Sequence, residues 1–400
     1  MRQAGPLRHK SFVARTRRLD DELDVLNLVT AGNFVWWHRG QGIVTDGVAC
    51  RVPVRDVQAV LSGIEVADGH DAPRRGPIAV GALPFDPAAA QDAELVVPAR
   101  VWGRDPQGHA WVTDVWPDME DRPRPWEEER TMPADLGPWH DASRAEWADA
   151  VGAALARIEA GKLDKVVLSR QVSMEADTAF QMGEVVRRLR IDQPGCRVFA
   201  TGGFVGATPE LLVERRGSVV RSRPMAGTVG ASGDRAVEWL VGSTKNRREH
   251  ALVVDAVVTK LQQMCPEPVQ ASHPYAEPFA DLAHIVTDIV GTLHAEAPSA
   301  LELALALHPT PAIAGTPEDE ALALIGALET RSRGRYGGSV GWVDADGDGE
   351  FAVALRCAEL CGNRAVLYAG AGIVAGSTAE DEWQETEAKF AAMRRALTPP

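Results

Sequence analysis

The chain has 400 residues, a formal net charge of −14 and an ordinary proportion of apolar residues. The acidic balance argues against nucleic acid or an anionic membrane as a partner, because such binding needs a basic face. No apolar run approaches the roughly 18 residues that span a bilayer, so we expect no membrane segment.

The five cysteines and the N-terminal residues indicate the compartment. The cysteines are odd in number, and the one close pair, Cys357 and Cys361, lacks the spacing of a zinc ribbon. The basic start MRQAGPLRHKSF has no apolar stretch behind it, so it is not a secretory signal. We therefore expect reduced thiols in a cytoplasmic protein.

The first 142 residues predict β-structure followed by an irregular connection. Residues 23–110 alternate short apolar runs, such as FVWWHRGQG and IAVGALPFD, with turn signals, which is typical of strands and hairpins. Residues 114–142 are rich in proline and in acidic residues, which favours a surface connection.

The remaining residues alternate predicted strands with longer predicted helices. A helix is expected to begin at Ser143 and to end at Gly161, and KVVLSRQV follows it as a strand. Later strands include RVFATGGFVG, LLVER and RAVLYAGAGIV, and later helices include REHALVVDAVVTKLQQM and EDEWQETEAKFAAMRRAL. We find no internal repeat and no linker long enough to separate independent domains.

Two glycine-containing motifs each allow two interpretations. DADGDGE at Asp344–Glu350 starts like a calcium loop, but Leu355 stands where the loop needs an acid, so a hairpin turn is favoured. GAGIVA within Tyr368–Gly376 fits a dinucleotide fingerprint, but too few residues follow for the second strand of that fold. We predict instead a turn whose backbone N–H groups hold a small anion such as a carboxylate.

Two predicted helices carry candidate metal ligands. Glu382, Glu385 and Lys389 are spaced i, i+3, i+7, so they share one helical face. Glu249 precedes a strongly apolar stretch at helical spacing. Each group alone is typical of a solvated charged surface. If the two helices converge, Glu249 and Glu385 supply the oxygen ligands that Mg²⁺ prefers.

Three further charged residues stand in apolar surroundings. Lys165 opens the strand KVVLSR and is either an edge charge or a buried amine whose lowered pKa suits a general base. Glu210 in TPELLVE is either a surface acid or a buried carboxyl whose raised pKa suits a general acid. Arg356 lies in the predicted strand EFAVALRCAEL, where a buried guanidinium needs an anion.

These residues belong to a longer ordered series of motifs. The series is KVVLSR, GATPELL, RPMAGT, KNRREH, HPTPAIAGTP, RGRYGG, LRCAE, GAGIV and EWQETEAK. It resembles the chorismate-utilising enzymes, which include isochorismate, salicylate, anthranilate and aminodeoxychorismate synthases. The resemblance covers residues 142–397, the expected chorismate-binding region, whereas residues 1–141 resemble only a variable N-terminal part. It implies an α+β fold, a single large domain over residues 1–400 with two big, mostly antiparallel sheets packed together and helices outside.

The resemblance also implies catalytic and metal-binding roles. Lys165 would be the base that activates water to attack C2 of the chorismate ring, and Glu210 the acid that protonates the departing C4 hydroxyl. Glu249 and Glu385 would hold Mg²⁺ against the ring carboxylate, and Glu382 would act through a metal-bound water.

The remaining implied roles concern substrate binding. Arg356, Tyr336 and backbone N–H groups near Gly370 and Gly372 would bind the enolpyruvyl carboxylate, with help from Lys389. The ring side would be lined by Gly227, Thr228 and His284. Some relatives have an acid where Asn246 stands here, and this departure could weaken the support of the metal.

Two positions favour one member of the family. Amine-forming and lyase-active relatives tend to have threonine where this chain has Ala312, and the water-using relatives carry a lysine at the position of Lys165. The expected activity is therefore that of an isochorismate synthase, and the water-using relatives need no amidotransferase subunit, so we expect a monomer. The alternatives are a salicylate synthase, which goes on to expel pyruvate, and a non-catalytic paralogue. The N-terminal region favours menaquinone biosynthesis over siderophore biosynthesis.

Overall fold

The computed structural model describes residues 12–67, 76–116, 132–230, 238 and 240–398. The predicted surface connection over residues 114–142 therefore lies partly outside the described residues. Its described end runs alongside the strand Lys165–Glu175. His140 forms an isolated bridge with Ser173 of this strand, and Leu136 forms one with Ala176, the residue after the strand.

The largest of three sheets places N-terminal and C-terminal strands side by side. Its neighbouring strands pair antiparallel, except for a parallel pair of β1 with β5. In spatial order it contains β20 (Gly315–Thr316), β10 (Lys165–Glu175), β24 (Arg364–Val374), β23 (Cys357–Cys361), β12 (Phe204–Thr208), β11 (Arg197–Thr201), β2 (Val35–His38), β3 (Gln41–Asp46), β8 (Arg100–Arg104), β9 (Ala110–Trp116), β1 (Val13–Arg18) and β5 (Glu65–Val66).

The second large sheet and a small third sheet complete the β-structure. The second contains β16 (Gln270–Ala271), β19 (Ile289–Thr292), β14 (Val219–Arg223), β13 (Leu211–Arg216), β22 (Gly349–Val353), β21 (Ser339–Asp344), β6 (Ile78–Ala82), β7 (Glu94–Val97) and β4 (Cys50–Pro53). The third contains β15 (Met225–Gly230), β18 (Leu282–Val286) and β17 (Tyr275–Pro278).

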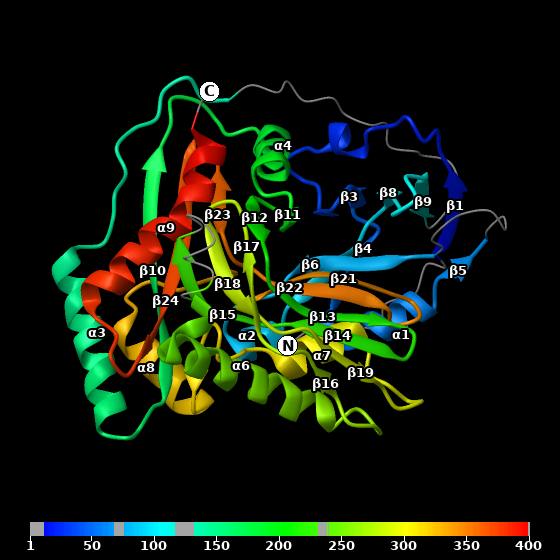
Figure 1. Cartoon of the computed structure of the whole chain (residues 1–400). Coiled ribbons are helices and arrows are strands. Elements are labelled where there is room, and N and C mark those ends of the chain that lie inside the picture. The colour runs from blue at the N-terminus through cyan, green and yellow to red at the C-terminus, as the bar shows by residue number, and fades with distance from the viewer. Residues whose placement is uncertain (1–11, 68–75, 117–131, 231–237, 239, 399–400) are drawn as a thin grey trace, which may run out of the picture.

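The helices lie on the outer sides of the sheets (Figure 1). They are η1 (Val25–Leu28), η2 (Val54–Asp56), α1 (Val57–Ser62), α2 (Pro87–Gln91), α3 (Arg144–Glu159), α4 (Met182–Asp192), α6 (Thr244–Gln262), α7 (Ala300–Leu307), α8 (Glu318–Leu328) and α9 (Ala379–Leu397). Helix α9, red in Figure 1, packs against β24 and α4, and α7 packs against β13, β21 and β22.

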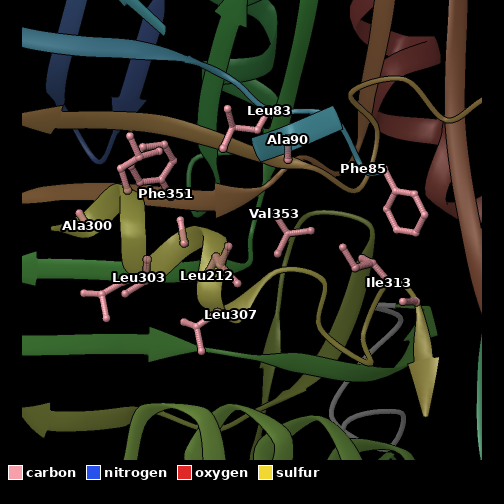
Figure 2. Close-up of a cluster of buried hydrophobic side chains, with 14 of the residues drawn as sticks. Leu83, Phe85, Ala90, Leu212, Ala300, Leu303, Leu307, Ile313, Phe351 and Val353 are labelled. Atoms are coloured by element: carbon pink, nitrogen blue, oxygen red, sulfur yellow. The ribbon is translucent and has the colours of Figure 1, made fainter. Parts of the chain in front are cut away.

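Strand β22 shows why two sheets and a helix layer form here. Successive side chains of a strand point to opposite faces. Ala352 belongs to a core cluster with Trp36 and Phe199 of the larger sheet, so one face of β22 packs on that sheet. Phe351 and Val353 point the other way, into the cluster that Figure 2 shows around the leucines of α7. The predicted α+β fold of two packed antiparallel sheets is confirmed.

Several local predictions can be compared with the structure. Helix α3 follows Ser143, whose side chain accepts the N–H of Glu146 while the Glu146 carboxylate accepts the N–H of Ser143, a capping box. The DADGDGE segment is the turn between β21 and β22, as predicted. All five cysteines are free thiols. Of the helices in the described part of the chain, none is long and apolar enough to cross a bilayer.

Candidate active site

One cavity collects almost all of the predicted site residues. It lies where β10 and β24 meet the three-stranded sheet, α6 and α9. The predicted residues that line it are Lys165, Glu210, Gly227, Thr228, Glu249, His284, Ala312, Tyr336, Arg356, Gly370, Gly372, Glu385 and Lys389. Glu382, the remaining one, is not among the lining residues.

Lys165 is buried at the start of β10, not an exposed edge charge. Its side chain is 1% exposed, and its Nζ lies 2.9 Å from Oε1 of Glu249 on α6. A Cβ atom at Gly372 would stand 2.6 Å from Oε1 of Glu249 and 3.0 Å from Cε of Lys165. A larger residue at position 372 would therefore displace the carboxylate of Glu249 from its contact with Lys165.

Glu210 is a buried carboxyl, as its apolar neighbours predict. It lies between β12 and β13 with 4% of its surface exposed. Burial raises the pKa of Glu210 to about 8, although Lys165 opposes the shift. The side chain is therefore mainly protonated at neutral pH and can donate a proton into the cavity.

Arg356 is buried without a counter-ion. The predicted continuous strand is wrong here: the chain bends at Arg356, between β22 of one large sheet and β23 of the other, with a φ of +48°. A left-handed φ is costly for a residue with a side chain and is found mainly where the surroundings impose it, often at functional sites. Within the described residues its guanidinium forms no ion pair, and burial lowers its pKa. A substrate carboxylate would supply the missing negative charge.

His284 orients this guanidinium. Its Nε2 lies 2.7 Å from Nη2 of Arg356, and its Nδ1 lies 3.2 Å from the carbonyl oxygen of Gly227 and 3.3 Å from Oγ1 of Thr228. Burial, reinforced by Arg356, lowers the pKa of His284 well below its usual value. The ring is therefore neutral, with Nδ1–H donating to Gly227 and Nε2 accepting from Arg356.

The glycines of GAGIV lie inside β24, so the predicted turn is wrong, whereas their predicted binding of a carboxylate stays a prediction. Ser169, opposite Gly370 on β10, donates its N–H to Glu329 and not to β24. In an antiparallel ladder this means that the N–H and C=O of Gly370 also point away from β10. The N–H and C=O of Gly372, two residues farther along β24, point away from β10 as well. The first residue of β23, Cys357, pairs with Tyr368, and β23 does not extend beside the later residues of β24. Gly370 and Gly372 therefore lie on an open edge among the described strands.

Helix α9 brings its charged face to that open edge. Lys389 donates to the carbonyl oxygen of Gly370 at 2.7 Å and to Oε1 of Glu385 at 2.6 Å. Glu382 is 3% exposed, and its Oε1 lies 3.1 Å from Nζ of Lys245. Burial, with a further contribution from Glu385, raises the pKa of Glu382.

The acidic side chains near the cavity have the chemistry of magnesium ligands but each contacts a lysine. The pairs are Lys165–Glu249, Lys389–Glu385 and Lys245–Glu382. No three metal-ligating side chains among the described residues are close enough to hold an ion as they stand. Glu249 and Glu385 nevertheless line one cavity, and carboxylate oxygens suit Mg²⁺. The donor set therefore fits this metal.

The match to known proteins is extensive. The family model described as chorismate binding enzyme matches residues 54–398. The chain belongs to the chorismate-binding enzyme family. The isochorismate synthase DhbC of Bacillus subtilis is 37% identical over 378 residues, which cover 89% of this chain and 91% of the relative. The isochorismate synthase EntC of Escherichia coli K12 is 33% identical over 329 residues, 80% of this chain and 81% of the relative.

A solved structure agrees with the fold of this chorismate-binding enzyme. The menaquinone-specific isochorismate synthase MenF of Escherichia coli superposes with a TM-score of 0.82 at 26% identity. The superposition covers 97% of this chain and 95% of that one. The match of the family model begins at residue 54, earlier than the resemblance at residue 142 that the motifs indicate.

Sequence reasoning missed several residues that line the cavity of this chorismate-binding enzyme. They are Val167, Pro209, Met225, Ala226, Ile313, Tyr368 and Ala369. Strand alternation could have found two of them, because Val167 lies two residues after Lys165 and Tyr368 two residues before Gly370. The ring of Tyr368 stacks on that of Tyr336, with centroids 5.4 Å apart and planes 12° apart.

Proposed function

We propose that this chorismate-binding enzyme is an isochorismate synthase that adds water at C2 of chorismate and removes the C4 hydroxyl. One observation carries the proposal: a buried lysine and a buried protonated glutamate, Lys165 and Glu210, line the same cavity. The relatives named above support it, since they are isochorismate synthases and match most of the chain.

The cavity offers cations where a dianionic substrate needs them. Arg356 is buried and unpaired among the described residues, so it would bind the enolpyruvyl carboxylate, with Tyr336 beside it. Lys389 and the open edge of β24 at Gly370 and Gly372 would hold the same group. A protein with a net charge of −14 can thus accept an anion because its positive groups are concentrated at one place.

The acid and the base would transfer protons in opposite directions. Lys165 would take a proton from water as its oxygen bonds to C2, and Glu210 would give a proton to the C4 hydroxyl, which leaves as water. The ring double bonds shift as the C4–O bond breaks, so product and substrate have the same composition. The turnover leaves Lys165 protonated and Glu210 ionised, and a return of one proton restores both.

Glu249 and Glu385 would hold Mg²⁺ beside the ring carboxylate, with Glu382 behind them. When bound, the metal neutralises charge that develops as the hydroxyl leaves and fixes the carboxylate. Each lysine contacts Oε1 of its glutamate, so the second carboxylate oxygen of Glu249 and of Glu385 would be available to the metal.

The Glu385→Gln substitution tests this assignment. We expect the Mg²⁺ concentration for half-maximal activity to rise by about tenfold or more, because a neutral amide is a weaker ligand. Mn²⁺ binding, measured by electron paramagnetic resonance without substrate, should weaken in parallel. Glu380→Gln on the exposed side of α9 is the matched control and should leave both unchanged. Equal Mn²⁺ affinity in the Glu385 variant and the wild type would remove Glu385 from the metal site.

The proposed reaction is tested by product analysis. Purified protein with chorismate and Mg²⁺ should form isochorismate with little pyruvate. Salicylate and pyruvate in amounts close to the chorismate consumed would instead identify a salicylate synthase. If neither product forms, the protein is not a catalyst of this class.

Partners and pathway follow from the nucleophile and the relatives. Because water is the nucleophile, no ammonia-supplying subunit is needed, and we propose a monomer. We also propose a role in menaquinone biosynthesis, as in the structural relative whose name specifies it. Chromatography with light scattering tests the first proposal, and menaquinone content in a deletion strain tests the second.

A further inference from the structure

Behind one wall of the cavity lies Arg333, a buried arginine that is not among the lining residues. This wall consists of Val167 on β10, Ala312 and Ile313 in the loop after α7, and Tyr336 in the RGRYGG turn. We propose that Arg333 is a positioning residue that fixes this wall at the distance from Lys165 and Glu210 that the substrate ring requires. The inference rests on the proposed function and adds to it a residue with no chemical role of its own.

The guanidinium of Arg333 bonds to the main chain of both wall segments. Its side chain is 2% exposed. Nη1 donates to the carbonyl oxygen of Ile313 and Nη2 to that of Val167, each at 2.7 Å. The carbonyl groups belong to lining residues, so the arginine sits directly behind the surface that the substrate would touch.

The rest of the guanidinium is held by one carboxylate. Nε and Nη2 donate to the two carboxylate oxygens of Glu329 at 2.8 and 2.5 Å, a bidentate pair. Glu329 also accepts the backbone N–H of Ser169 at 2.7 Å. Both partners of the ion pair are therefore tied to β10, which carries Lys165. Arg333 connects the wall to the strand of the proposed base.

Arg333 also reaches the third part of the wall and a packing partner. Its carbonyl oxygen accepts the N–H of Tyr336 at 3.0 Å. The ring of Phe85 lies 4.3 Å from the guanidinium carbon, within reach of a cation–π interaction. Figure 2 shows Phe85 and Ile313 as members of one hydrophobic cluster. The arginine is thereby held in place on its apolar side as well.

The loop after α7 needs hydrogen bonds from outside to fix its position, because it has no regular secondary structure of its own. Residues 308–314 belong to neither a helix nor a strand. One backbone hydrogen bond, from the N–H of Val167 to the carbonyl oxygen of Ala314, joins the loop to β10. The guanidinium of Arg333 adds a second connection, because it donates both to Ile313 in the loop and to Val167 on β10. Five rigid donors suit this task, whereas the single ammonium of a lysine cannot reach all three acceptors.

The Arg333→Lys substitution tests the role. We expect the KM for chorismate to rise about tenfold while kcat changes by less than about threefold, because the wall shifts but the acid and the base remain. The matched control is Arg100→Lys on β8, which alters another buried, ion-paired arginine that does not line the cavity. It should lower Tm as much as Arg333→Lys and leave KM within about twofold of the wild type.

The outcomes separate this inference from the proposed function. If wild-type protein forms no isochorismate, the proposed function fails, and chorismate affinity from calorimetry replaces KM for every variant. If Arg333→Lys does not fold, Phe85→Leu takes its place, with an expected rise of about threefold because it loosens the guanidinium without removing it. A folded Arg333→Lys protein with lowered Tm but unchanged KM and affinity would overturn the inference and leave Arg333 a stabilising residue only.

Discussion

Replacing Lys165 with alanine is expected to lower kcat for isochorismate formation by about a thousandfold, within the range that general bases contribute. The reason is that Lys389 is the one other lysine that lines the cavity among the described residues, and its Nζ contacts the carbonyl oxygen of Gly370 on β24. Chorismate binding should weaken much less, because the variant keeps Arg356, the proposed partner of the enolpyruvyl carboxylate. Steady-state kinetics at saturating Mg²⁺ and a chorismate titration by calorimetry give the two quantities.

Two controls make the Lys165 experiment decisive. Lys162→Ala changes an exposed lysine three residues earlier and should leave kcat unchanged. Thermal unfolding with and without Mg²⁺ shows whether the unpaired Glu249 has disturbed the site, since the proposed metal would replace the missing positive charge. A correctly folded Lys165→Ala protein with wild-type kcat would mean that water is activated by another group, and the proposed mechanism would be wrong.

The parts of the fold that follow local rules were predictable. The start of helix α3 is marked by the capping box at Ser143 and its end by Gly161, with an apolar face between them. All three signals lie within a short stretch of chain. Helix α4 was not predicted, although Met182, Val185 and Leu189 are buried on one face of it. It lacks the side-chain cap that marks the start of α3, so the apolar face is the weaker signal that remains.

The errors occurred where tertiary structure overrides the local pattern. The sequence EFAVALRCAEL contains no residue that indicates the end of a strand. Arg356 nevertheless takes a left-handed φ, because the chain passes there from one large sheet to the other. Similarly, glycines normally indicate turns, but Gly370 and Gly372 lie in a strand. Their missing side chains make room for Tyr336, Lys165 and Glu249, which approach from distant segments.

The site residues were predicted better than their contacts. Motif order identified nearly all the charged residues of the cavity, because each belongs to a recognisable short stretch. The Glu385–Lys389 pair follows from helical spacing, because the two residues are four positions apart on α9. The Lys165–Glu249 pair could not be predicted, since these residues are far apart in the sequence and only the fold decides which charges meet. The role of Arg333 was hidden for the same reason: its acceptors are main-chain atoms at positions 167 and 313.

Charge distribution connects the fold to the proposed reaction. The bend at Arg356, the neutral ring of His284 and the open edge of β24 together form the anion site that we propose for this acidic protein. Burial has opposite chemical results in the same cavity. Among the described residues it leaves the Arg356 guanidinium without an ion pair, as the proposed substrate-binding role needs, and it raises the pKa of the Glu210 carboxyl, as the proposed proton donor needs.

Glu210→Gln should therefore have opposite effects on activity and on stability. The amide has the size of the carboxylic acid but cannot donate a catalytic proton, so kcat should fall about a hundredfold or more. In the wild type, kcat/KM should decline as the pH rises past about 8, where Glu210 ionises. A pH profile from 6 to 9.5 should show that this alkaline limb is absent from the residual activity of the variant.

The stability effect of Glu210→Gln has a defined sign and pH window. Folding raises the pKa of this carboxyl from 4.5 to about 8, so between these pH values the folded state holds a proton that the unfolded chain has released. The wild-type free energy of unfolding should then fall, relative to the variant, by up to about 1.4 kcal/mol per pH unit as the pH rises through the window. Urea unfolding at pH 5, 6.5 and 8 measures the difference, and Glu214→Gln, the same change on the partly exposed Glu214 of β13, is the control. A variant that is no more stable than the wild type at pH 8 and has lost no activity would show that Glu210 is neither a buried neutral acid nor the proton donor.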